Sequence, residues 1–170
     1  MLFRSSLVEG SLATVSLSFL VDSLEKRRGG CAANISFGMG ALGLSPILIA
    51  SVGVDWPDYD AWLKRHGVDT RFVKVSETLY TATFMVTTDQ ELNQIASFFP
   101  GAMREARDIE LSPIMDKAGV FDLITISPDD PEAMLRHSET CRALKIPFGA
   151  DPSQQLARMN GPEIKKLIED

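Results

Sequence analysis

The chain of 170 residues is long enough for one domain with one substantial core, and a composition of 45% apolar and 24% charged residues is typical of a soluble globular protein. A formal net charge of −6, with no long run of Lys or Arg, argues against binding to nucleic acid or to an anionic membrane. No apolar segment is long enough to span a membrane, and the first residues lack the order of a signal peptide.

The cysteines and histidines show no spacing typical of a metal site or of a catalytic dyad. Cys31 and Cys141 are far apart, so we expect packing thiols in a reduced, cytoplasmic protein. His66 and His137 lie in polar stretches and are interpreted as surface residues rather than catalytic groups.

The first half of the chain begins with a predicted strand and helix. Residues 15–21 alternate apolar and polar side chains, which indicates a half-buried strand. Gly29 and Gly30 close that segment, and the small-residue run 32–42 predicts a helix that stops at Gly43. The glycines leave the first amides of the helix open to an oxygen-rich ligand, and Asn34 could hydrogen-bond a hydroxyl. A hinge and helix start without a ligand is the alternative.

The middle of the chain predicts two strands, a helix and a hairpin. The continuous apolar run 46–52 favours a strand buried on both faces, as in a parallel sheet. Asp55 is expected to cap a helix that runs to about residue 65, and residues 71–75 form a short strand. Residues 81–88 and 94–99 flank a polar turn and indicate an antiparallel hairpin.

The last third repeats the alternation of strand and helix. Residues 120–126 and 146–150 predict buried strands, and Asp130–Pro131 begins a helix to about residue 144. A short helix opens at Asp151–Pro152, and a last one ends near residue 169. The fold class is therefore α/β with a parallel sheet and a small second, antiparallel sheet. So few core strands would leave an apolar edge uncovered, and we expect the 170 residues to be part of a larger domain.

Two glycine motifs need separate interpretation. Residues 38–43 match GxGxxG, but a helix precedes them and a strand follows, which is the reverse of a dinucleotide-binding loop. We interpret them as close packing within a helix. Gly149-Ala150-Asp151 lies at the carboxyl end of a predicted strand, where ligands bind in open α/β sheets. Asp151 either takes part in a ligand site or only caps the following helix.

Two further groups of side chains are candidates for binding. Gln154, Gln155 and Arg158 follow a strand end, where a pocket is expected, although solvated surface residues would look the same. Three phenylalanines lie on the strands of the hairpin, namely Phe84, Phe98 and Phe99. They either pack on a core or sandwich a flat heterocycle, and spacing does not decide between the two.

Several motifs in order resemble the ribokinase-like (PfkB) carbohydrate and nucleoside kinases over nearly the whole chain. They are Gly29-Gly30-x-x-x-Asn34, Leu42-Gly43, Val52-Gly53-x-Asp55, Gly67-Val68-Asp69-Thr70 and Thr81-Ala82-Thr83. More specifically, residues 15–22, 94–103 and 150–158 are similar to bacterial adenosine kinases of the actinobacterial type.

The resemblance implies a ribokinase-like fold, a parallel sheet flanked by helices plus a lid sheet, and ATP- and Mg²⁺-dependent phosphorylation of the ribose 5′-hydroxyl of adenosine in purine salvage. It also implies a homodimer that pairs through lid strands, at about residues 14–22 and 80–99. The substrate-binding residues that it implies are Ser18 and Phe19 beside the nucleoside, Gly30 and Asn34 on the ribose, Phe84 and Phe98 on the adenine, and Gln154, Gln155 and Arg158 in the cleft.

The chain departs from the family pattern at both ends. Residues 1–13 do not match the first core strand, and the Gly-Ala-Gly-Asp motif that supplies the anion hole and catalytic base is absent. We therefore expect residues 1–170 to form a single incomplete ribokinase-like domain that holds no catalytic base or metal ligand and is inactive alone. The alternatives are a sugar kinase of the same family, for ribose or a fructose derivative, and a non-catalytic fragment that binds nucleoside or oligomerises.

Overall fold

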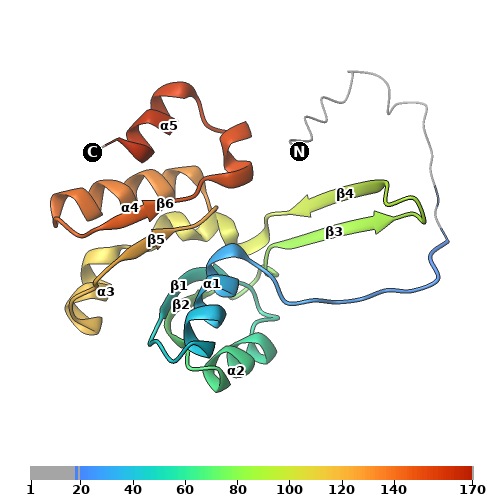
Figure 1. The fold of residues 1–170 in the computed structure, drawn as a ribbon, viewed down its shortest axis with the longest axis horizontal. Helices are drawn as coiled ribbons and strands as arrows, with labels where there is room; N and C mark the ends of the chain where they lie inside the picture. The colour runs from blue at the N-terminus through green and yellow to red at the C-terminus, as the bar shows by residue number, and fades with distance from the viewer. Residues whose placement is uncertain (1–17, 19, 170) are drawn as a thin grey trace.

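The computed structural model describes residue 18 and residues 20–169 of the chain. Helices and strands alternate along most of that length (Figure 1). The α-helices are α1 (Cys31–Ala41), α2 (Pro57–Arg65), α3 (Leu111–Ala118), α4 (Pro131–Ala143) and α5 (Gly161–Ile168). The strands are β1 (Ile47–Val52), β2 (Asp69–Val75), β3 (Thr83–Thr88), β4 (Gln94–Phe99), β5 (Ile124–Ile126) and β6 (Phe148–Ala150). The 3₁₀-helices are η1 (Gly101–Asp108) and η2 (Ser153–Ala157).

The strands pair in the arrangement that the sequence predicts. β1 and β2 are parallel and connected by α2, and β5 and β6 are parallel and connected by α4. β3 and β4 form an antiparallel hairpin that projects from the body of the molecule (Figure 1, green). Parallel pairs need such helical crossovers, whereas the hairpin needs only a tight turn. The predicted α/β class with a small, separate antiparallel sheet is confirmed.

The buried apolar residues fall into clusters around each parallel pair. The first cluster joins α1, β1 and α2, and the second joins α4, β5, β6 and α5. A third, smaller cluster packs η1 and α4 against β1. The buried members of the first two clusters are Ala33, Leu48, Val52, Trp56, Leu63 and Val68, then Ile126, Met134, Met159 and Leu167.

Small residues let α1 approach its neighbours closely. A Cβ atom on Gly40 would lie 2.0 Å from the carbonyl oxygen of His66, so only glycine fits there. The helix ends in a left-handed turn at Gly43 (φ 83°), whose amide donates to Gly40 O while Leu44 N donates to Met39 O. Both the stop at Gly43 and the packing interpretation of the GxGxxG match are confirmed.

Two secondary-structure predictions need correction, and a third lies mostly outside the described residues. β5 covers only Ile124–Ile126, because β6 offers just three residues for pairing, and Val120 lies outside the strand and is 96% exposed. Asp55 does not cap α2; its carboxylate accepts hydrogen bonds from Thr81 instead. Most of the predicted strand at 15–21 lies outside the described residues, and the described residues 18, 20 and 21 belong to no strand.

The predictions for single cysteines and histidines also change. Cys141 is buried, as expected, but Cys31 is exposed at the start of α1. Neither histidine is a free surface residue. His66 Nδ1 lies 2.7 Å from Trp62 O, and His137 Nε2 lies 3.0 Å from Ile109 O. Burial lowers the pKa of His137, which favours a neutral ring with a packing role.

Candidate functional site

The turn at Gly29 and Gly30 forms the start of α1. Gly30 has φ 96° and ψ 126°, a backbone conformation that suits glycine. Among the described residues no side chain caps this helix start, so its first amides can donate to a ligand oxygen. Asn34 is exposed one turn further, and its backbone amide donates to Gly30 O (2.9 Å). Gly30 and Asn34 therefore lie together at one helix end, as predicted.

Aromatic side chains of α2 hold this turn. Tyr59 donates its hydroxyl hydrogen bond to Gly29 O (3.0 Å), and the guanidinium of Arg28 lies 5.2 Å from the ring centroid of Trp62. Trp62 stacks on Phe37 of α1, with ring centroids 4.5 Å apart. A cation–π contact of this kind contributes about 0.5–1 kcal/mol at an exposed site. The turn is thus attached to α2 as well as to α1.

The hairpin presents an aromatic pair on one of its faces. Phe84 of β3 and Phe98 of β4 are directly opposite in the register, and directly opposite residues project from the same face. Their side chains are 56% and 50% exposed, so the pair does not pack in a core. Phe99 pairs with Thr83 and therefore belongs to the other face. Within the described residues Phe84 and Phe98 thus pack in no core, and their role in binding a heterocycle stays a prediction.

The segment after β6 holds the third predicted group. Asp151 Oδ1 accepts from Ser153 N (3.0 Å), and Ser153 adopts an unusual positive φ of 43° at this strand-to-helix turn. Gln155 is buried, and its Oε1 accepts from Nη1 of Arg158 (3.3 Å). Gln154 and Arg158 are exposed. Gln155 is thus enclosed and bonded to Arg158, whereas Gln154 and Arg158 are open to solvent.

The structure brings together residues within each predicted group rather than all of them at one point. Within residues 20–169, no hydrogen bond joins the start of α1, the hairpin and the segment after β6. Ser18 is exposed, and Phe19 lies outside the described residues.

Sequence reasoning missed Asp129, which follows β5 at the same sheet edge as Asp151 follows β6. Carboxyl ends of parallel strands are where open α/β sheets bind ligands. Burial raises the pKa of Asp129 to about 7, and the negative charge of Asp130 adds to the effect, while a hydrogen bond from Asp130 N (2.8 Å) opposes it. The signal in the sequence is the carboxylate pair Asp129-Asp130 in the turn shortly after β5, and a strongly shifted pKa is a feature that clusters at functional sites.

Asp130 differs from its neighbour because it has structural partners. Its carboxylate accepts from Ala133 N (3.3 Å) at the start of α4 and pairs with Arg107 Nη2 (2.7 Å) of η1. Asp130 therefore caps a helix and ties η1 to it, which leaves Asp129 as the less constrained carboxyl group.

The described part of the chain offers no ready metal centre, since no three His, Cys, Asp or Glu side chains there gather closely enough to hold an ion. Nor does any helix in that part combine the length and apolar character needed to cross a membrane.

Comparisons with known proteins agree with this geometry. The family model described as pfkB family carbohydrate kinase matches residues 2–169. A nucleoside kinase of Methanothermobacter thermautotrophicus is 28% identical over 153 residues, which cover 89% of this chain and 49% of that protein. The chain thus spans about half the length of this relative.

Solved structures give the same result. A nucleoside kinase of Burkholderia thailandensis in complex with inosine superposes with a TM-score of 0.81 at 32% identity, covering 90% of this chain and 50% of the other. The same enzyme in complex with ADP-inosine gives a TM-score of 0.76 at 30% identity and covers 99% and 52% of the two chains. The fold, the order of the elements and the match over residues 2–169 lead to one conclusion: the chain belongs to the pfkB family of carbohydrate kinases.

Proposed function

We propose that this chain supplies the nucleoside-binding and lid part of an ATP-dependent kinase that phosphorylates the 5′-hydroxyl of a purine nucleoside, adenosine in the first place. The observation that carries the proposal is the exposed, directly opposed pair Phe84 and Phe98 on the hairpin. Sugars have no aromatic face for such a pair, whereas a purine base does. The inosine bound by the Burkholderia thailandensis relative is also a purine nucleoside.

The other predicted residues receive roles from their positions. Gly30 and Asn34 would bind ribose hydroxyls, through helix-start amides and a side-chain amide respectively. Gln154 and Arg158 would line the cleft beyond β6, with Gln155 orienting Arg158. Ser18 and Phe19 would border the nucleoside. In this proposal residues 1–170 form part of one ribokinase-like domain, with the lid at about residues 80–99.

The proposed lid function follows from the shape of the hairpin. β3 and β4 project from the body on two chain segments, one before β3 and one after β4, and we propose that the strands beyond these segments close over a bound nucleoside (Figure 1). Closure would exclude water and prevent loss of the transferred phosphoryl group to hydrolysis. Phosphoryl transfer depends on positioning and charge stabilisation, which the resemblance assigns to a Gly-Ala-Gly-Asp motif that these 170 residues do not contain.

ATP and Mg²⁺ would therefore not be held by this chain alone. Mg²⁺ in such a site takes oxygen ligands from one or two carboxylates and from the phosphates of the nucleotide, so its site goes with the ATP site. We assign the ATP and Mg²⁺ sites to the half of the relatives that this chain does not match, and expect no kinase activity from the 170 residues alone.

The test is calorimetric titration of the chain with adenosine, inosine and ribose. Replacing Phe98 by Ala should weaken adenosine and inosine binding about 5- to 150-fold, because base–aromatic stacking contributes about 1–3 kcal/mol. Phe99→Ala, on the same strand but the opposite face, is the matched control and should change the affinity little. Equal nucleoside affinity in wild type and Phe98→Ala would refute the stacking role.

The same titration separates the rival functions. A sugar kinase for ribose or a fructose derivative would bind ribose as well as adenosine and would not respond to Phe98→Ala. A non-catalytic fragment would bind a nucleoside or a second copy of this chain, but it would not be part of a longer protein with a catalytic half. The intact mass of the natural protein decides that point, since a mass near 18.7 kDa would leave only the non-catalytic alternative.

The second face of the hairpin supports a further part of the proposal, a homodimer through lid strands. Met85 and Ile95 are both 54% exposed, and Phe99 lies on the same face. Pairing with a second hairpin would cover this apolar face and the strand edges. Sedimentation of Met85→Lys should shift toward monomer, and an unchanged dimer fraction would exclude this interface.

A further inference from the structure

The feature that carries a further inference is the root of the hairpin, residues 78–82 before β3 and residues 100–102 after β4. Its two legs are joined by a hydrogen bond from Ala102 N to Tyr80 O (2.9 Å). The first leg is also bound to the segment after β1, because Val54 N donates to Leu79 O (2.9 Å). The root therefore connects the hairpin to the body by backbone bonds on both sides.

Two glycines allow these backbones to lie in direct contact. A Cβ on Gly53 would lie 2.2 Å from Thr81 N, and one on Gly101 would lie 2.2 Å from Tyr80 O. The hydroxyl of Thr81 completes the junction, since it donates to Asp55 Oδ1 (2.7 Å) and accepts from Gly53 N (2.9 Å). Contacts this close leave no room for the legs to slide.

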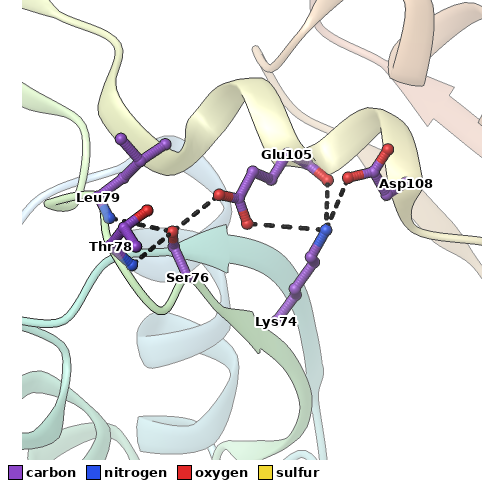
Figure 2. Close-up of polar contacts among 6 residues, drawn as sticks. All are labelled: Lys74, Ser76, Thr78, Leu79, Glu105 and Asp108. Atoms are coloured by element: carbon purple, nitrogen blue, oxygen red, sulfur yellow. Dashed lines mark hydrogen bonds and ion pairs between the residues drawn. The ribbon is translucent and has the colours of Figure 1, made fainter.

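Ser76 is the centre of a polar network beneath the root (Figure 2). It is 3% exposed, and its Oγ accepts from Thr78 N (3.4 Å) and Leu79 N (3.1 Å) at the first leg. The same hydroxyl donates to Oε1 of Glu105 (2.7 Å), which lies in η1 just after the second leg. One buried hydroxyl thus links both legs through side chains.

Lys74 provides the counter-charge for this network. Its Nζ lies 2.7 Å from Asp108 Oδ2 and 3.7 Å from Glu105 Oε2, as Figure 2 shows. The hydrogen bond with Asp108 raises the pKa of Lys74, and the charge of Glu105 adds to the effect, so the ammonium stays protonated. Asp108 touches only the outer side of the network, which makes it a suitable control position.

We propose that Ser76 and Glu105 are positioning residues that fix the root and thereby place the Phe84–Phe98 pair over the nucleoside. The Phe84–Phe98 pair is the second pair of the hairpin, next to Thr83–Phe99 at the root. Its location therefore depends directly on the direction in which the root points the hairpin. If the root is fixed, movement of the lid is confined to β3 and β4. This inference rests on the proposed function, because it assigns a purpose to the aromatic pair.

The experiment measures the hairpin angle on the 170-residue chain by pulsed electron paramagnetic resonance. Spin labels are attached to two introduced cysteines, Glu91→Cys at the hairpin turn and Arg65→Cys at the end of α2, both at exposed positions. The exposed native Cys31 is replaced by Ser so that it takes up no label. Glu105→Ala should broaden the distance distribution about twofold or more, since the Ser76 hydroxyl loses its acceptor.

Three matched variants make the result specific. Glu105→Gln should retain the wild-type width, because its amide oxygen still accepts from Ser76. Asp108→Asn, which weakens the contact with Lys74 but leaves the Ser76–Glu105 hydrogen bond in place, should retain it too. Glu105→Asp is too short to reach Ser76 and should broaden the distribution; it replaces Glu105→Ala if that variant does not fold. A wild-type width in both Glu105→Ala and Glu105→Asp would overturn the proposal.

Adenosine titration of the same proteins supplies the functional readout. If the root holds the pair in place for only a third of the time, the apparent affinity falls about threefold. A broadened distribution with unchanged adenosine affinity would also overturn the positioning role. If the wild type itself binds no adenosine, the proposed function fails, while the distance distributions still decide whether Ser76 and Glu105 fix the root.

Discussion

Replacing Asp129 by Asn should make the protein more stable at pH 8 but not at pH 4. Burial raises the pKa of Asp129 from its usual 3.8 to about 7 in the folded state. Below pH 3.8 the group is protonated in both states and folding carries no penalty. As the pH rises toward 7, the unfolded chain loses this proton while the folded chain keeps it, so stability falls and reaches its low level above pH 7.

The magnitude follows from the two pKa values. Each tenfold change in proton affinity corresponds to about 1.4 kcal/mol, so the shift from 3.8 to about 7 gives a penalty of about 4 kcal/mol at most at pH 8. The side-chain amide introduced by Asp129→Asn would carry no charge, and its oxygen could still accept from Asp130 N as the carboxylate does (2.8 Å). The variant should therefore gain most of that amount at high pH.

The assay is urea unfolding of wild type and Asp129→Asn at several values between pH 4 and pH 8. Carboxylates with lowered pKa, such as Asp55 and Asp69, work in the opposite direction but are common to both proteins and cancel in the difference. Asp122→Asn removes the carboxylate of an exposed residue just before β5 and is the control for the loss of one negative charge. A stability difference that stays constant across the range would refute the argument.

Three other substitutions have expected outcomes. Gly40→Ala should lower the free energy of unfolding by about 1–3 kcal/mol, because its Cβ would overlap His66 O, whereas Gly38→Ala has open space and should be neutral or stabilising in thermal unfolding. Asn160→Ala removes the cap of α5 and should lower the stability of that helix by about 1 kcal/mol, which amide hydrogen exchange would detect as faster exchange in α5. Exchange rates in α5 equal to those of the wild type would contradict this. Gly30→Ala has room for its Cβ but strains the backbone at φ 96°, so calorimetry should show a loss of about 1–2 kcal/mol, and no loss would mean that the turn relaxes freely.

Local patterns predicted the elements that local forces determine. The apolar run of β1, the glycine stop at Gly43 and the turn between β3 and β4 each depend on neighbouring residues, and all three are confirmed. Pro131 after Asp130 predicted the start of α4 for the same reason.

Long-range contacts account for the failures. Asp55 has the sequence of a helix cap, but its carboxylate is used by Thr81, 26 residues away. The burial that raises the pKa of Asp129 depends on how the surrounding elements pack, which the spacing of residues does not reveal. No element was predicted over residues 101–118, where the structure has η1 and α3. Of the candidate site, the opposition of Phe84 and Phe98 followed from hairpin register, whereas the burial of Gln155 did not.

The contact between Arg28 and Trp62 gives the molecule an intrinsic optical reporter. The chain has two tryptophans, of which Trp56 is buried and Trp62 lies under the guanidinium next to Gly29 and Gly30. Indole emission depends on nearby charge, so any displacement of the glycine turn would change the fluorescence of Trp62. In a Trp56→Phe background, stopped-flow fluorescence could time the rearrangement of this turn without any attached dye.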